Sequence, residues 1–201
     1  MALSQKALQR KREKKKQIRQ AKIIKPLVSA SKNVACSSWP IYECWIPAGL
    51  WDLGIGHVVV SRRNNLGDIA VGMYLVDVFC LGIKDCFVRL IDSIEYKEIL
   101  KKTAMNCGKL EPIDPSYANT LIHKAVEYAN HLGFKPHSDF SKAKLMLKNI
   151  PIDETIEFVF GKNNSPFYIQ GPHESPADVK RIMRTLATKV GCDNHQFLVE
   201  G

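Results

Sequence analysis

Apolar and polar positions between residues 41 and 91 follow a pattern that predicts β-strands. Residues 41–46 lie between two prolines, and residues 57–63 are rich in β-branched side chains. Residues 68–79 are apolar at both odd and even positions, which is typical of a central strand covered on both faces. Residues 86–91 form a further predicted strand, so this part of the chain is expected to fold as an antiparallel sheet.

Turn residues connect these strands and introduce the first helix. The sequence Asn-Asn-Leu-Gly-Asp at 64–68 predicts a hairpin loop with a glycine available for a positive φ. Gly72 is expected to mark a β-bulge in the strand that follows. Ser93 is predicted to cap a helix over residues 94–105, and residues 106–113 then connect the two halves of the chain.

The second half begins with helical periodicity. The Asp-Pro pair at 114–115 is a strong helix start, and the apolar stripe that follows it ends at Gly133. A shorter helix is predicted over residues 140–147, with Ser138 or Asp139 as its N-cap.

The remaining pattern predicts a second hairpin and a last helix. The hairpin would pair residues 155–160 with residues 167–170 across a loop at 161–164. The helix begins with a capping box at Ser175 and ends at Gly191. The order of elements predicts an α+β fold, in which an antiparallel sheet with hairpins packs against three to four helices.

Composition sets the expected domain boundaries. One folded domain is expected, although two lobes that share an interface would also suit the length. The predicted divisions are a basic arm at 1–25, a linker at 26–38, a domain at 39–191 (as lobes, 39–106 and 112–191) and a tail at 192–201.

The formal net charge of +9 is concentrated at the N-terminus. Residues 1–25 hold ten of the 29 basic side chains and one of the 20 acidic ones, so the rest of the chain carries 19 of each and sums to zero. The basic residues of the arm are Lys6, Arg10, Lys11, Arg12, Lys14, Lys15, Lys16, Arg19, Lys22 and Lys25.

The arm is predicted to be disordered, or a fraying helix, when it is free. It is made of good helix formers, but like charges repel at i,i+4 positions and no apolar residue lies between Leu8 and Ile18. Dense cations on a segment free to follow a backbone suit phosphates, so nucleic acid is the favoured partner. An acidic protein surface, a membrane surface and a merely solubilising tail are the alternatives. The composition also resembles that of ribosomal protein extensions.

Aromatic and basic residues just after the linker offer a further nucleic-acid contact. Trp39, Tyr42, Trp45 and Trp51 would stack unpaired bases if exposed, but the strand-like alternation around them favours a role in the core. Arg62 and Arg63, at a predicted strand end, are candidates for phosphate contacts; the alternative is a solvated strand end.

Three residues are candidates for catalysis. Asp77 lies in an apolar strand, where a charge is costly unless it is paired, so it is either a general base or metal ligand, or a structural group bound to Lys84 or to backbone N–H groups. His137 and Asp139 lie two apart in a turn, a spacing that suits acid–base or metal chemistry. The alternative is that Asp139 caps a helix and His137 is exposed.

Other classes of protein are disfavoured. No apolar run approaches the ~18 residues that a membrane helix needs, and the N-terminus lacks the apolar region of a secretory signal. None of the six cysteines forms a C-x-x-C pair, so they are expected to be reduced and mostly buried. The expectation is a soluble cytoplasmic protein with no membrane partner, no metal site and no cofactor.

Three pieces of the chain carry a resemblance. Residues 75–82 (LVDVFCLG), residues 133–137 (GFKPH) and the FGK of 160–162 with the Gly-Pro of 171–172 resemble an uncharacterised family of bacterial proteins. The resemblance would cover most of the predicted domain. It implies a bacterial origin, but no activity and no catalytic residue.

The sequence therefore favours a binding protein over an enzyme. The leading prediction is a small protein that associates with RNA or the ribosome through its basic arm. One alternative is a metal-dependent nuclease or other hydrolase that uses Asp77, His137 and Asp139. Another is a protein-interaction module that the arm tethers to nucleic acid. The hydrolase requires Asp77 to converge in space with His137, Asp139 or Glu43.

Overall fold

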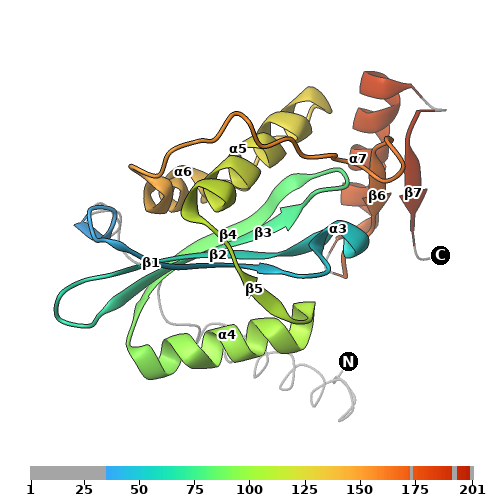
Figure 1. The fold of residues 1–201 in the computed structure, drawn as a ribbon. Helices are drawn as coiled ribbons and strands as arrows, with labels where there is room; N and C mark the ends of the chain where they lie inside the picture. The colour runs from blue at the N-terminus through green and yellow to red at the C-terminus, as the bar shows by residue number, and fades with distance from the viewer. Residues whose placement is uncertain (1–34, 173, 192–193, 200–201) are drawn as a thin grey trace, which may run out of the picture.

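The computed structural model describes residues 35–172, 174–191 and 194–199. The predicted arm and residues 26–34 of the predicted linker lie outside these residues. The architecture is α+β, as the sequence predicts, with a five-stranded antiparallel sheet between helical layers (Figure 1). In the part of the chain that is described, no helix is both long and apolar enough to span a bilayer.

The main sheet is a meander to which one short strand is added. Its spatial order is β4-β3-β2-β1-β5, and every neighbouring pair is antiparallel. The strand β5 lies in the region that the sequence assigned to a connection, and it pairs with the outer edge of β1. The strands are β1 (Ile41–Pro47), β2 (Ile55–Arg63), β3 (Ile69–Asp77), β4 (Gly82–Ile91) and β5 (Leu110–Pro112).

The strand β3 occupies the interior of the sheet, as its two apolar faces predict. It pairs with β2 from Ile69 to Asp77 and with β4 on its other side, and all its residues except Leu75 are buried. The loop before β3 is held by the side chain of Asn64, whose Oδ1 accepts hydrogen bonds from the N–H groups of Leu66 and Asp68. The predicted hairpin loop is therefore confirmed.

The bulge predicted at Gly72 is wrong. The irregularity in the β3–β4 pairing lies between Leu75 and Val76. Gly72 instead lets the side chains of Met146 and Tyr74 approach the strand closely. A Cβ at this position would lie 3.3 Å from the Cβ of Met146 and 3.1 Å from the hydroxyl of Tyr74. A side chain at position 72 would therefore require Met146 or Tyr74 to shift by a few tenths of an ångström.

Helices cover both faces of the sheet. Figure 1 shows α4 (Ser93–Cys107) on one face and α5 (Pro115–His131) with α6 (Phe140–Ala143) on the other. A 3₁₀ helix, η1 (Lys144–Leu147), continues α6, so the single helix predicted here is two short ones. The short helix α3 (Leu50–Leu53) links β1 to β2.

The caps of these helices differ in part from the prediction. Asp114 caps α5 as expected, and its carboxylate accepts the N–H of Ser116. The N-cap of α4 is Asp92 rather than Ser93, because the Asp92 carboxylate reaches the N–H groups of two residues in the first turn. Asp139 holds the N-cap position of α6 but forms no cap hydrogen bond with its side chain.

The C-terminal elements form a separate layer at one end of the sheet. They are α7 (Pro176–Val190), β6 (Phe167–Ile169) and β7 (Gln196–Leu198). The capping box at Ser175 is confirmed, with Asp178 as its N3 partner.

The second predicted hairpin is wrong. Residues 155–160 form no strand, and β6 pairs in parallel with β7 instead. In the region of the predicted loop, an isolated antiparallel β-bridge pairs Lys162 with Ser165. The alternation that suggested a strand arises because Ile156, Phe158 and Phe160 face the protein while the residues between them face solvent.

Three apolar clusters hold these layers together. The largest fills the space between the sheet and α5, with Val58, Tyr74 and Leu121 fully buried. A second lies under α4 around Val71 and Tyr96. The third joins the C-terminal end of α5 to α7 and β6, with Ala129, Leu132, Tyr168 and Leu186. Because α5 contributes to two clusters, it connects the C-terminal layer to the sheet.

Candidate functional site

Most of the predicted nucleic-acid contacts lie outside the described residues. These are the ten basic side chains of the arm, from Lys6 to Lys25. The other candidates, Arg62, Arg63, Asp77, His137 and Asp139, lie within the described residues.

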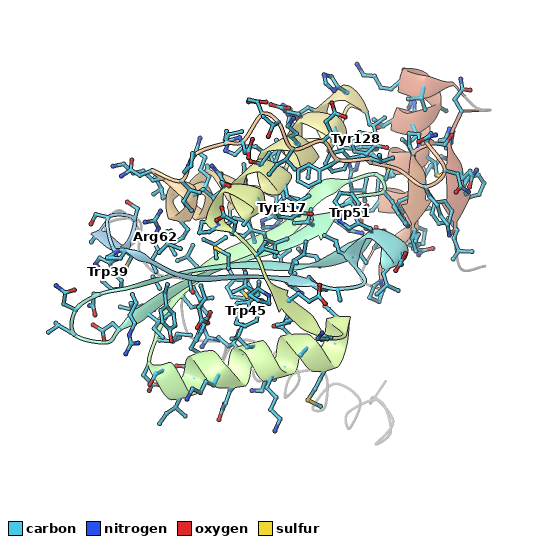
Figure 2. All side chains as sticks on the ribbon, viewed as in Figure 1. Trp39, Trp45, Trp51, Arg62, Tyr117 and Tyr128 are labelled. Carbon is cyan, nitrogen blue, oxygen red and sulfur yellow. The ribbon has the colours of Figure 1, made fainter. Side chains whose placement is uncertain are left out.

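Arg62 does not face solvent, which corrects its assignment as a phosphate contact. The residue is 4% exposed, and its guanidinium donates to the carbonyl oxygens of Met146 (2.9 Å), Trp39 (2.6 Å) and Lys148. Figure 2 shows it between β2 and the α6 side of the molecule. The sequence could not reveal this role, because the carbonyls belong to distant segments of the chain.

Arg63 is exposed and remains a candidate for contact with nucleic acid. Its guanidinium carbon lies 5.2 Å from the centroid of the Tyr42 ring, and Tyr42 is 39% exposed. A guanidinium over an aromatic ring is a surface on which a base can stack. The two side chains lie at the end of β1 and β2 nearest the hairpin loop.

The three tryptophans are mainly packing residues, as the alternation favoured. Each is partly buried, and Figure 2 places Trp45 on the α4 side of the sheet. The Trp45 indole N–H donates to Glu43 (3.1 Å). Trp51 stacks on Phe158 with ring centroids 5.5 Å apart, and Phe158 in turn contacts Tyr117 edge to face.

Asp77 is 5% exposed and held by the backbone that follows it. Its Oδ1 accepts the N–H groups of Phe79 (3.0 Å) and Cys80 (2.8 Å), which confirms the predicted backbone hydrogen bonds. Burial raises the pKa of Asp77 to about 6, although the positive charge of Lys84 and these hydrogen bonds oppose the rise. A buried carboxyl with a raised pKa is also a common property of functional sites.

His137 and Asp139 are close to each other, and no hydrogen bond or ion pair among the described residues joins either of them to Asp77. The Nδ1 atom of His137 lies 4.0 Å from the Asp139 carboxylate and 3.9 Å from that of Asp85. Asp139 forms a closer ion pair with Lys142 (3.0 Å), and hydrogen bonding from that lysine lowers the pKa of Asp139.

The arrangement that a metal-dependent hydrolase needs does not occur among the described residues. No hydrogen bond or ion pair there joins Asp77 to His137 or Asp139, and Glu43 binds Trp45 and Tyr96 on the α4 side. Across residues 35–172, 174–191 and 194–199, no group of three or more His, Cys, Asp or Glu side chains could hold a metal ion.

Buried thiols also lack the properties of catalytic groups. Cys44 and Cys86 are buried, and burial, together with nearby carboxylates, raises the pKa of each to about 12. Burial raises the pKa of Cys80 as well. A thiol with a raised pKa is unreactive at neutral pH, as expected for small apolar core residues.

Two neighbouring hollows bring together polar side chains that the sequence did not connect. A cleft of about 480 Å³ is lined by Lys84, Lys135, His137, Glu174 and Arg181, and it lies between β4, the end of α5 and α7. A smaller pocket of about 140 Å³ lies between the ends of β2 and β3 and the strand β6. Lys84 lines both, so it marks the wall between them.

Lys84 is held in place by an ion pair. Its ammonium lies 2.7 Å from the carboxylate of Glu174, and the two side chains are 15% and 17% exposed. The hydroxyl of Tyr168 and the N–H of Gly171 also donate to Glu174, at 2.6 Å and 2.8 Å. Burial opposes ionisation of Glu174, but the hydrogen bonds from Lys84, Tyr168 and Gly171 outweigh this effect and lower the pKa of Glu174.

The smaller pocket combines three polar side chains with apolar walls. Asp77, Lys84 and Gln170 line it together with the rings of Phe79 and Phe167. Such a combination of apolar surface and a few convergent polar groups is typical of small ligand sites. Sequence reasoning connected Asp77 with Lys84 but not with Gln170, which lies in the segment after β6.

Comparison of the chain with protein-family models, curated proteins and solved structures found no match.

Proposed function

We propose that this protein binds RNA in the bacterial cytoplasm, either the RNA of the ribosome or another RNA molecule. Its basic N-terminal arm supplies most of the affinity. The observation that carries the proposal is the separation of charge: ten basic residues and one acid in residues 1–25, against a neutral remainder. Phosphate neutralisation by such a segment provides affinity that does not depend on base sequence.

The described residues supply cationic side chains at the cleft. Lys84, Lys135 and Arg181 line it together with His137. Lys180 and Arg184, which are also exposed on α7, line a separate hollow. Two carboxylates in this cleft offset part of the charge, so the cleft suits a single strand with a few phosphates better than a duplex. This supports a single-stranded nucleic acid over a duplex.

The proposal is tested by titrating the full-length protein with a labelled single-stranded RNA at several salt concentrations. If about six cations of the arm contact phosphates, the plot of log K against log salt has a slope of about −4 to −5. Replacing Lys14, Lys15 and Lys16 by alanine should weaken binding to every sequence alike and make the slope shallower by about 2 to 3.

A matched control replaces three exposed lysines of α4, Lys97, Lys101 and Lys102, by alanine. It removes the same charge from α4, on the face of the sheet opposite α5 (Figure 1), and the slope should change by less than in the arm variant. Equal slopes for the wild-type protein and the arm variant would refute the proposal. Binding of an acidic protein with the same salt dependence, and no binding of RNA, would support an acidic protein surface as the partner of the arm instead.

A further inference from the structure

A third hollow, of about 330 Å³, lies between α3, the start of α5 and the segment 156–159. Its lining residues are Trp51 of α3, Tyr117 of α5, Ile156, Glu157, Phe158 and Val159. Figure 2 shows Trp51 and Tyr117 on the α5 side of the sheet. The three rings are half-buried and Val159 is 70% exposed, so this hollow presents aromatic surface to solvent.

The three aromatic rings of this hollow hold one another in place. Phe158 stacks on Trp51 with ring centroids 5.5 Å apart and an angle of 16° between the planes. It meets Tyr117 edge to face, with centroids 5.2 Å apart. Because the rings come from three segments that pack together, their faces are positioned before any ligand binds. Exposed aromatic faces attract the cationic groups of arginine and lysine.

The segments that build this part of the surface carry acidic side chains and no basic ones. These segments are residues 49–54, 110–117 and 150–160. They adjoin one another, because β5 pairs with the end of β1 just before α3, and Phe158 contacts both Trp51 and Tyr117. Their acidic residues are Asp52, Glu111, Asp114, Asp153, Glu154 and Glu157. We call these three segments, with the hollow between them, the acidic aromatic surface.

Two lysines offset part of this negative charge. The ammonium of Lys109 lies 3.5 Å from the carboxylate of Glu111, and that of Lys124 lies 3.6 Å from the carboxylate of Glu154. Both pairs are largely open to solvent on the acidic side, where Glu111 is 49% and Glu154 80% exposed. The remaining acids of the surface must therefore be considered without these partners.

Four acids of the surface form no ion pair among the described residues. Asp52 and Glu157 are exposed, and Glu157 lines the hollow itself. Hydrogen bonding by the serine or threonine two positions later lowers the pKa of Asp114 and of Asp153, so both carboxyls are ionised at neutral pH. The surface thus combines aromatic rings with excess negative charge, and it suits a segment rich in lysine and arginine.

We infer that the acidic aromatic surface is a docking site for the protein's own basic arm, residues 1–25, and that RNA competes with it for the arm. The charges are complementary, because the arm has ten basic side chains and one acid, whereas the three segments of the surface have no basic side chain. The inference rests on the proposed binding of RNA and adds how that binding is regulated.

The length of the chain allows the arm to reach this surface. Residues 26–34 separate the arm from the first described residue, and these nine residues can span about 30 Å when extended. A domain of this size has a radius of gyration of about 15 Å. Because the arm belongs to the same chain, its effective concentration at the surface is on the order of millimolar, so a weak contact is sufficient.

The contact is of a kind that RNA can displace. Exposed ion pairs and cation–π contacts each contribute little, and salt screens them. An RNA strand offers the arm a regular row of phosphates and releases counterions when it binds. The docked arm is unavailable to RNA, so docking lowers the apparent affinity for RNA by the fraction of molecules in which the arm is free.

The first experiment cross-links carboxylates to amines in the full-length protein with a water-soluble carbodiimide and maps the products by mass spectrometry. We expect lysines of the arm to be joined to Asp52 and Glu157, and saturating single-stranded RNA to suppress most of these products. Glu98 on α4, whose side chain is 62% exposed, is the internal control and should react with the arm much less.

A mixture of ¹⁵N-labelled and unlabelled protein shows which copy supplies the arm. Products that lie within one copy support the inference. Products that join a labelled copy to an unlabelled one would show that the surface receives a second molecule, and would overturn it. Arm cross-links that form as readily at Glu98 as at Glu157, or that persist when RNA is bound, would also overturn it.

The second experiment measures the affinity of the full-length protein for single-stranded RNA at low salt. The variant Asp52→Asn/Glu157→Gln should bind about threefold more tightly or better, because the arm is released from the surface. The matched control Asp68→Asn/Glu98→Gln removes the same charge from exposed acids elsewhere, and its gain should be less than about twofold. Equal gains in the two variants would refute docking at this surface.

A third comparison separates release of the arm from a general loss of repulsion. The gain from Asp52→Asn/Glu157→Gln should shrink when residues 14–16 are also replaced by alanine, because it depends on the cations of the arm. An undiminished gain would contradict the inference. Absence of the cross-links, with the steep salt dependence of RNA binding retained, refutes the docking alone. Cross-links without any binding of RNA refute the proposed function instead.

Discussion

The ammonium of Lys84 lies 2.7 Å from the carboxylate of Glu174, so an ion pair shielded from most solvent ties strand β4 to the turn before α7. The pair is made by segments that are far apart in the chain. It fixes the one side chain that lines both the cleft and the smaller pocket.

The first prediction concerns this ion pair. Glu174→Gln leaves the ammonium of Lys84 without its counter-charge in a largely buried place, so it should reduce the free energy of unfolding by about 3 kcal/mol. The double variant Glu174→Gln/Lys84→Met should lose less free energy of unfolding than the two single variants lose together, because the pair is then removed as a unit. Urea unfolding of the four proteins measures the coupling.

The exposed pair between Lys109 and Glu111 is the control. Its ammonium and carboxylate are 3.5 Å apart with side chains 81% and 49% exposed, and Glu111→Gln should change stability by less than about 1 kcal/mol. Strictly additive effects of Glu174→Gln and Lys84→Met would contradict the first prediction.

The second prediction compares neighbouring arginines. Arg62→Lys should destabilise the protein by about 2 to 4 kcal/mol, because a lysine ammonium cannot reach three carbonyl oxygens arranged for a guanidinium. Arg63→Lys, on the exposed side, should stay within about 0.5 kcal/mol of the wild type. Chemical denaturation checks both, and similar values for the two variants would show that the buried hydrogen bonds of Arg62 contribute little.

The third prediction is a dependence of stability on pH that comes from Asp77. Its pKa in the folded protein, about 6, is above the ordinary value of 3.8, so the folded state binds the proton more tightly than the unfolded state. The resulting stabilisation is complete below pH ~4 and is lost as the pH rises through about 6. Relative to Asp77→Asn, the wild type should lose about 3 kcal/mol across this range.

Unfolding of both proteins in urea at pH 4, 5, 6 and 7.5 measures that difference. Lys84 and Cys80 lie close enough to Asp77 to influence it, and both are unchanged in the Asn variant. A difference that is constant with pH would mean that the carboxyl of Asp77 titrates normally in the folded protein.

The fold was predictable where the signal is local. The two apolar faces of β3, the Asp-Pro start of α5 and the capping box at Ser175 each depend on neighbouring residues, and each is confirmed. The strands β5 and β7 were missed because three residues are too few to show alternation. Residues 155–160 alternate for another reason, which is packing of aromatic side chains against Trp51 and α5.

The candidate site was much less predictable, because it depends on long-range contacts. Asp77 attracted attention as a charge in an apolar strand, and the structure confirms that it is buried. Nothing near Arg62 in the sequence indicates that its partners are carbonyls of Trp39, Met146 and Lys148. Nothing near Gln170 in the sequence indicates that its side-chain oxygen is buried without a hydrogen-bond partner among the described residues.

The fourth prediction concerns the arm. Deletion of residues 1–25 should leave thermal unfolding cooperative, because the described residues already build three apolar clusters and the arm has no apolar stripe to pack on them. Differential scanning calorimetry of the truncated and full-length proteins checks this. Loss of the transition in the truncated protein would show that the arm is part of the fold.

The parallel pairing of β6 with β7 has a consequence for synthesis of the protein. The N–H of Gln170 donates to the carbonyl of Leu198 (3.0 Å), so the wall of the smaller pocket is completed by a strand that is translated after α7. During translation the basic arm leaves the ribosome long before residues 196–198 do. The pocket is therefore incomplete in a nascent chain until β7 has been made, and a protein shortened before residue 196 would lack the partner of β6.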